Sequence, residues 1–323
     1  MRRGARIAVA GGVLATLLAA AGALYVVDRY QRPGPLAAAT SVIVPKGAGV
    51  SEIARMLEAA NVISAAPVFR MGARLEGLDG SLRAGEYRFP PAVSMRQALL
   101  MLRQGDTVVR RVTIPEGMTS RQVVSLLDQA EGLVGEIAVV PVEGALLPET
   151  YSYSWDDSRS DMIRRMSSAM SSTLDELWAN RAENLPLAAP REAVVLASIV
   201  EKETGVPEER PRVAAVFLNR LRLGMKLQAD PTVTYAIFGA SASPRPLTSA
   251  DLQYPSPYNT YLAAALPPGP IANPGRASLQ AILRPAQTDD LFFVADGTGG
   301  HAFARTLEEH NRNVARRRKP NDE

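Results

Sequence analysis

The chain of 323 residues contains no cysteine and only two histidines. Without cysteine there is no disulfide, no thiol nucleophile, no cysteine-bound zinc and no lipid-modified cysteine. The histidines, His301 and His310, are too few for a metal cluster and leave little material for a serine–histidine pair. GxSxG, HExxH, P-loop and GxGxxG patterns are also absent, which excludes several large enzyme classes. We therefore predict no metal site, and we expect His301 to be structural.

The chain also lacks a strong charge imbalance. Its 36 basic and 33 acidic side chains give a net charge of +3. Arg2, Arg3 and Arg6 account for the whole excess, because residues 1–27 contain no acidic side chain. The neutral remainder argues against nucleic acid as a partner. The length predicts two folded units in addition to any anchor.

Residues 7–27 carry no charge and consist mainly of alanine, glycine, leucine and valine. A helix of about 20 such residues crosses a bilayer. We therefore predict a single transmembrane helix over 7–27, with residues 1–6 in the cytoplasm because of their arginines. A cleaved signal peptide is the alternative, since residues 19–23 are small, but the apolar run is long for one. Both interpretations place the rest of the chain outside the cytoplasm.

An internal repeat follows a predicted linker at 28–40. The segment 42–47 (VIVPKG) returns 70 positions later at 112–117 (VTIPEG), and the apolar positions of the following residues also match. Each copy predicts a short strand, a Pro–Gly turn and an amphipathic helix. Between the copies, 85–89 predicts a strand and 94–104 a helix that ends at Gly105.

These strand–turn–helix units resemble LysM modules, which bind the N-acetyl sugars of peptidoglycan and chitin. A structural α+β repeat without a ligand is the alternative, and the sequence leaves both open. We predict a small LysM-like α+β domain over 41–140, whose second copy can pack with either part of the chain.

The remainder, 141–323, is predicted to be a larger α+β domain. Helices are expected at 161–179, 193–200, 212–223 and 306–318, with a short strand at 291–295. The segment 193–200 is apolar on all sides, which predicts a helix buried all round. Residues 244–285 are rich in proline, asparagine, glycine and tyrosine and give few helix signals.

A charged cluster closes this apolar helix. In the run 197–204 (ASIVEKET), helical spacing puts Glu201 over Val194, Ala197 and Ser198. Partial desolvation there would raise the pKa of the carboxyl and suit it to general acid catalysis. The alternative is a helix end that emerges into water, with Glu201 and Glu203 solvated.

Several motifs occur together in this half of the chain. They are ASIVEKE at 197–203, VFLNRL at 216–221, LQADPTVTY at 227–235, VEG at 142–144, LPETY at 147–151, SPYNTY at 256–261, LPPGPI at 266–271, NPG at 273–275 and GHAF at 300–303. Their identity and order resemble those of the endolytic murein transglycosylases, the YceG-like family. The resemblance covers nearly all of the chain after the predicted anchor.

The resemblance implies a bacterial inner-membrane enzyme whose catalytic domain is periplasmic. It would cut between N-acetylmuramic acid and N-acetylglucosamine within a peptidoglycan glycan strand and leave a 1,6-anhydro end. The family's essential glutamate falls on Glu201. One carboxyl suffices, because the muramic C6 hydroxyl is the nucleophile and no second carboxylate is needed to activate water. No metal or organic cofactor is implied, and peptidoglycan synthases are expected neighbours.

Other polar residues in the motifs are candidates for sugar contacts: Glu143, Asn219, Gln228, Asp230, Tyr235, Tyr258 and Asn259. Each could instead have a structural role in a turn or in the core. Asp230, for example, precedes Pro231 and could cap a helix or a turn. The run 145–147 departs from the family pattern by lacking an aromatic residue, which affects the expected details of the substrate groove.

Two rival functions remain. A non-catalytic, membrane-tethered glycan-binding or division scaffold protein would keep the same fold and the same repeats. A hydrolase would deliver water in place of the C6 hydroxyl. The products distinguish all three functions, because they are anhydro ends, reducing ends or no cleavage at all.

Overall fold

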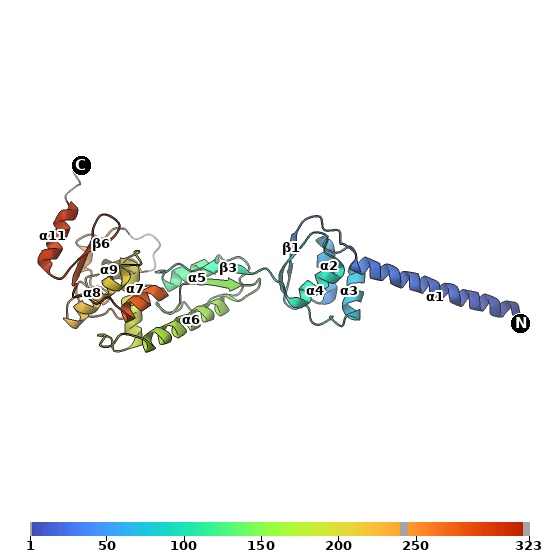
Figure 1. The fold of residues 1–323 in the computed structure, drawn as a ribbon, viewed down its shortest axis with the longest axis horizontal. Coiled ribbons are helices and arrows are strands. Elements are labelled where there is room, and N and C mark those ends of the chain that lie inside the picture. Colours follow the sequence, from blue (N-terminus) through green and yellow to red (C-terminus); the bar gives the residue numbers. More distant parts are fainter. Residues whose placement is uncertain (1, 240–244, 319–323) are drawn as a thin grey trace. The chain divides into compact units, whose positions relative to one another are not determined.

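The computed structural model describes residues 2–239 and 245–318 and divides the chain into two compact units (Figure 1). The small unit comprises residues 1–110 and 152–157, and the large unit comprises 111–151 and 158–323. The boundary expected near residue 140 thus differs from the division at 110–111. The second repeat copy belongs to the large unit, because its residues make their contacts there.

The N-terminal helix α1, Arg2–Gln31, is continuous over 30 residues. Within the described residues, the stretch Gly11–Gln31 is long and apolar enough to cross a membrane, and its most apolar part is not buried in the protein, although Tyr30 near its end is. An apolar helix near the N-terminus was expected, although its end lies beyond the predicted Val27. The helix therefore qualifies as a candidate membrane anchor.

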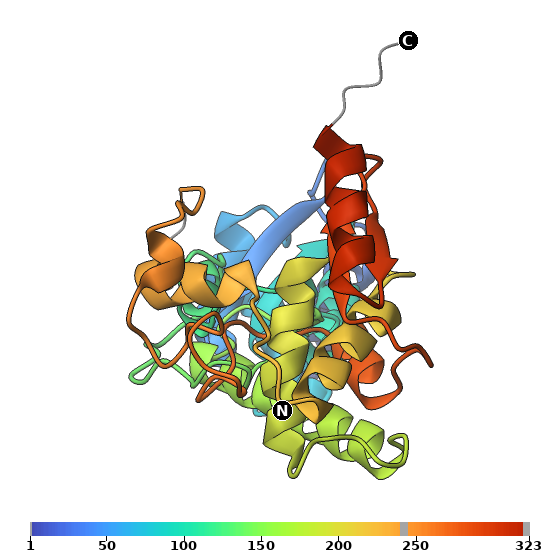
Figure 2. The same ribbon diagram turned by 90° about the vertical axis from the view of Figure 1, so that its left-hand side faces the viewer.

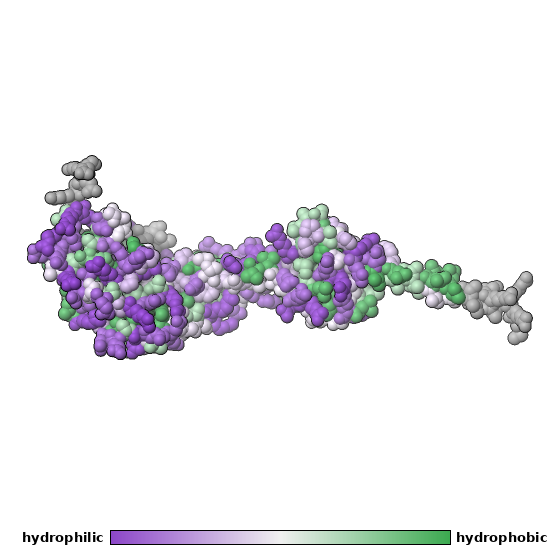
Figure 3. Space-filling model, viewed as in Figure 1, coloured by the Kyte–Doolittle hydropathy of each residue, from purple (hydrophilic) through white to green (hydrophobic). Residues whose placement is uncertain are grey.

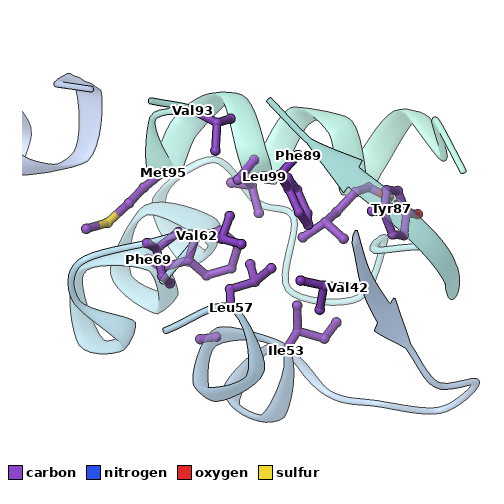
Figure 4. Close-up of a cluster of buried hydrophobic side chains, with 14 of the residues drawn as sticks. Val42, Ile53, Leu57, Val62, Phe69, Tyr87, Phe89, Val93, Met95 and Leu99 are labelled. Carbon is purple, nitrogen blue, oxygen red and sulfur yellow. Dashed lines mark hydrogen bonds between the residues drawn. The ribbon is translucent and has the colours of Figure 1, made fainter. Parts of the chain in front are cut away.

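The small unit continues with β1 (Thr40–Val44), α2 (Val50–Ala59), α3 (Ala66–Leu75), β2 (Gly85–Phe89) and α4 (Met95–Gln104). Strands β1 and β2 are antiparallel, with Val42 opposite Tyr87. The side chains between them and the helices form a dry core, in which Leu57, Phe69 and Phe89 are fully buried (Figure 4). The predicted strand 85–89 and helix 94–104 are confirmed. A capping box begins α4, and Gly105 ends it at φ 78°.

The large unit is mainly helical. Its elements are β3 (Arg110–Thr113), α5 (Ser120–Asp128), β4 (Thr150–Tyr153), α6 (Arg159–Ala179), α7 (Pro190–Glu203), α8 (Arg210–Arg222), α9 (Asp230–Phe238), η1 (Asp251–Gln253), α10 (Arg276–Leu283), β5 (Phe292–Ala295), β6 (His301–Ala304) and α11 (Leu307–Arg318). Its core forms where α7, α8 and α10 pack together. Figure 2 shows α11 at the edge of this unit, on the side opposite α6.

The helices predicted in this unit are confirmed, and every residue from 193 to 200 is buried. Two helices were not expected, α9 and α10. The second lies inside the segment 244–285, where a helix begins directly after Gly275. Residue 244, the first of that segment, lies outside the described residues, as do 240–243 before it.

Candidate active site

The candidate site forms at the C-terminal end of α7, where a distant loop is bonded to the helix. Ser198 is fully buried, and its hydroxyl donates to the carbonyl of Val195 at 2.7 Å. The same hydroxyl accepts the backbone N–H of Ile271 at 3.0 Å. The hydrogen bond to Ile271 in the loop therefore explains why a serine lies inside this apolar helix.

Asn273 in that loop joins the second repeat copy to the end of α7. Its side-chain oxygen accepts the N–H of Leu146 at 3.0 Å, and its amide nitrogen donates to the carbonyl of Met118 at 3.0 Å. Its backbone N–H also donates to Met118, and its carbonyl accepts the N–H of Gly117. Since Asn273 is completely buried, these bonds form a fixed polar connection rather than a surface contact.

Glu201 lies inside this connection, and both of its oxygens have partners. One accepts a hydrogen bond from Arg210, the first residue of α8, at 3.3 Å, and the other accepts the N–H of Gly275 at 2.8 Å. The Arg210 guanidinium also contacts Glu116 at 3.2 Å. Burial, and next the charge of Glu201, raises the pKa of Glu116. Only 4% of the Glu201 side chain is exposed, so its carboxyl is enclosed in a charged cluster.

Glu203, two residues further along α7, has the opposite surroundings. Its carboxyl has no hydrogen bond or ion pair with any described residue. Its pKa is raised to about 8, mainly by burial and next by the charge of Asp230, while Arg220 opposes the rise. Glu203 is therefore largely protonated at neutral pH. The alternative in which Glu203 is simply solvated at a helix end is wrong.

A cleft of about 380 Å³ opens beside these residues, between the second repeat copy and α9. It is lined by Gly117, Thr119, Gln122, Lys202, Asp230, Pro231, Thr234, Tyr235, Gly239 and Ile271. Asp230 at its edge accepts a hydrogen bond from the Tyr261 hydroxyl at 2.6 Å. Glu203 is not among the residues that line the cleft, but the charge of Asp230 at the edge of the cleft acts on its carboxyl.

Two of the predicted sugar-contacting residues, Asp230 and Tyr235, line the cleft, and Tyr258 and Glu143 lie near Tyr235. Tyr235 and Tyr258 have ring centroids 5.0 Å apart, and Asp230 lines the edge. Glu143 accepts the N–H of Ser120 at 2.8 Å, and burial raises its pKa. The charge of Glu143 helps burial to raise the pKa of Tyr235 to about 12, which indicates that the two side chains are near each other.

The other three predicted residues have different surroundings. The Asn219 amide donates to the carbonyls of Thr288 and Asp290. Asn259 is completely buried, and its amide donates to two backbone carbonyls. Gln228 is exposed in a left-handed turn with φ 53°. Asn219 and Asn259 therefore have the structural contacts that were considered as their alternative.

The structure also brings in residues that the sequence analysis did not select. Lys202 donates to the carbonyl of Gly117 and lines the cleft, while Glu116 and Arg210 complete the cluster around Glu201. The sequence did contain a signal for Glu116. The second repeat copy carries this glutamate at the position where the first copy has Lys46. His301 is bonded to Glu209 at 2.6 Å, as expected for a structural histidine.

Comparison with known proteins extends these observations. A protein from Bacillus subtilis called endolytic murein transglycosylase is 30% identical over 84% of this chain and 83% of its own length. A Streptococcus pneumoniae protein of the same name is 30% identical over 85% of this chain, which spans 58% of that longer protein. A crystal structure described as a yceG-like protein from Listeria monocytogenes matches with a TM-score of 0.53 at 30% identity, over 85% of this chain and 98% of that one. The model of the YceG-like family matches residues 42–316, and the chain belongs to this family.

Proposed function

We propose that this protein is an endolytic murein transglycosylase. It would cleave the bond between N-acetylmuramic acid and N-acetylglucosamine within peptidoglycan glycan strands. The observation that carries the proposal is the Glu203 carboxyl at the end of α7, whose pKa is raised to about 8 by burial and by the charge of Asp230, a residue that lines the cleft. The names of the relatives from Bacillus and Streptococcus support the same activity.

The proposed reaction needs one carboxyl used twice. Glu203 donates its proton to the glycosidic oxygen as the bond from that oxygen to C1 breaks. The muramic C6 oxygen then forms a bond to C1, and its proton passes to the Glu203 carboxylate. The carboxyl is restored, and the strand ends in a 1,6-anhydro ring. A raised pKa suits the first step, because only the protonated carboxyl can start it.

Glu201, the acid that the family resemblance implies, remains the alternative to Glu203, and the variants below decide between them. Both Glu201 oxygens are occupied, by Arg210 and by the N–H of Gly275. If Glu203 is the acid, these two contacts give Glu201 a different role. We propose that Glu201 is a positioning residue that fixes the loop at 275 and the turn at 116–117 beside the cleft.

Other residues around the cleft are proposed to bind the substrate. The ring pair Tyr235–Tyr258 offers an aromatic face on which a sugar ring can stack. Asp230 and Glu143 can accept hydrogen bonds from hydroxyl and acetamido groups. Asp230 has a second role, because its negative charge helps to keep Glu203 protonated.

The test compares Glu203→Gln with Glu201→Gln in the digestion of purified peptidoglycan. Removal of the transferable proton at Glu203 should lower the rate by roughly 10²- to 10⁴-fold or more, because the same group serves as acid and base. Glu201→Gln should retain most of the activity after correction for folded protein. If Glu203→Gln has wild-type activity, or if Glu201→Gln alone is inactive while folded, the assignment to Glu203 fails.

Mass spectrometry of the same digests separates the proposed reaction from its rivals. Anhydro ends support the transglycosylase, reducing ends indicate a hydrolase, and uncut strands indicate a binding or scaffold protein. The rate should also fall as pH rises through about 8, where Glu203 loses its proton. A rate that rises over this interval contradicts an acid with a raised pKa.

We further propose that α1 is a single-pass anchor in the bacterial inner membrane, with residues 1–6 in the cytoplasm and both units in the periplasm. The arginines before the apolar stretch support this orientation. A reporter that is active only outside the cytoplasm, fused after Glu323, should work, and the mature protein should retain residues 1–27. Glycan binding by the LysM-like small unit and the neighbouring synthases stay predictions, and titration of that unit with chitooligosaccharides tests the first.

A further inference from the structure

The outward face of α3 in the small unit exposes two large apolar side chains. Leu75 is 80% exposed, the highest value among the large apolar residues that are described as exposed, and Met71 is 46% exposed. They are four positions apart and therefore lie on the same face of the helix. The opposite face, with Phe69 and Ala73, is fully buried in the core. Helix α3 therefore has large apolar side chains on its solvent-exposed face as well as on its buried face.

The exposed face lies beside the end of α1. The Tyr30 ring covers Gly72 so closely that an added Cβ would come within 2.3 Å of it. The Tyr30 hydroxyl also donates to Glu76 at 3.0 Å. A shallow groove between the two helices is lined by Val26, Val27, Tyr30, Val68, Met71, Gly72, Leu75 and Glu76. The side chains of Met71 and Leu75 are therefore level with the last two turns of the candidate membrane span, Gly11–Gln31.

Basic side chains adjoin the same face. Arg70 and Arg74 are exposed on α3 and line a cleft of about 620 Å³ together with Met71 and Leu75. Arg74 pairs with Asp79 at 3.5 Å, whereas Arg70 has no ion pair with any described residue. A guanidinium is well suited to bind phosphate oxygens, including those of lipid headgroups.

We propose that α3 lies against the bilayer surface, at the leaflet where the C-terminal end of α1 emerges. Met71 and Leu75 insert at the boundary between headgroups and acyl chains, and Arg70 and Arg74 bind the phosphates of anionic phospholipids. The inference rests on the proposal that α1 spans the membrane. A helix with apolar residues on one face and arginines beside them is typical of such interfacial binding.

The position of the patch favours a bilayer over a chance exposure. Single exposed apolar residues are common on protein surfaces. Here, however, the apolar surface of α1 is followed by further apolar surface on the small unit next to it (Figure 3). Because Tyr30 fixes α1 against α3, insertion of α1 brings Leu75 to the membrane surface without any rearrangement of the unit.

The lack of cysteine allows single labels to be placed in the full chain. Leu75→Cys, Leu18→Cys and Val109→Cys variants carry an environment-sensitive fluorophore in vesicles of phosphatidylethanolamine and phosphatidylglycerol. Leu18 reports on the span, and Val109, which is 60% exposed in the small unit, is the matched apolar control. Nitroxide-labelled phospholipids should quench the label at position 75 severalfold more than the label at position 109, with a blue shift of its emission.

The outcomes separate the two proposals. Quenching at 18 but not at 75 overturns the docking of α3 and leaves the span intact. Absence of quenching at 18 overturns the span and, with it, the docking. Adding Arg70→Gln and Arg74→Gln should reduce quenching at 75 in the anionic vesicles but not in vesicles of phosphatidylcholine alone. If quenching at position 75 is the same in both kinds of vesicle, and the same with and without the arginines, then the arginines do not bind anionic headgroups.

Discussion

The two copies of the strand–turn–helix repeat begin alike and are used differently. In the first, the turn at Pro45–Gly47 is open, and nothing lies within 4 Å of a Cβ added to Gly47. In the second, a Cβ on Gly117 would lie 3.2 Å from Lys202 and 3.5 Å from Glu201. Both copies bury the same helix face, through Leu57 and Leu127. The shared pattern thus determines the fold of each copy, and the residues at the turn determine whether that copy borders the site.

The largest expected difference concerns these glycines. Both have positive φ, 84° and 75°, so alanine at either position should cost about 1–2 kcal/mol of stability. Only Gly117→Ala also presses on Lys202 in the cleft, so only this variant should lose activity per folded molecule. Calorimetry and peptidoglycan digestion of Gly47→Ala and Gly117→Ala test this. Equal activity of the two variants would show that the second turn is as independent of the site as the first.

A smaller effect is expected at the next pair of equivalent positions, Lys46 and Glu116. Glu116→Ala removes a partner of Arg210, and because Glu116 is 40% exposed the loss of stability should be about 1 kcal/mol or less. The activity should fall roughly tenfold, since the turn beside the cleft loses its fixed position. Lys46→Ala should change neither quantity measurably. A Glu116→Gln variant with full activity would assign the role to shape rather than charge.

The smallest effect concerns the starts of the two repeat helices. Thr119 caps α5 in a capping box with Gln122, whereas Gly49 begins α2 without a side-chain cap. Thr119→Ala should therefore cost about 1 kcal/mol, and Gly49→Ser should stabilise the small unit by a few tenths of a kcal/mol. Space is available for the serine, because nothing lies within 4 Å of a Cβ at Gly49. Thermal unfolding of both variants provides the measurement, and destabilisation by Gly49→Ser contradicts the expectation.

The sequence predicted those features that depend on neighbouring residues. The apolar helix at 193–200, the helix at 94–104 that ends at Gly105 and the repeat itself all follow from local spacing. Helix α3 was missed because Gly72 weakens its helix pattern by about 1 kcal/mol. The reason for that glycine is the Tyr30 ring, 42 positions earlier, and such a contact leaves no local signal.

The choice between Glu201 and Glu203 was beyond local reasoning for the same cause. Helical spacing correctly put the two carboxyls on different faces of α7. It could not show that Arg210 and the Gly275 N–H occupy one of them, or that Asp230 lies near the other. Four of the seven proposed sugar-contacting residues line the cleft or lie near Tyr235 at its wall, because the motifs that contain them meet there. Asn219 instead bonds the carbonyls of Thr288 and Asp290, and Asn259 bonds carbonyls within its own loop.

The Asn273 connection has a consequence for biosynthesis. It binds residues 117, 118, 120 and 146 to a loop that is made more than 120 positions later. Chains emerge from the ribosome N-terminus first, and contacts between distant segments must wait for the later one. With the proposed topology, the small unit can fold while the chain is still being exported, whereas the cleft cannot close until residue 273 has crossed the membrane. Under the same proposal, an incompletely exported chain would be tethered and partly folded but would lack the closed cleft.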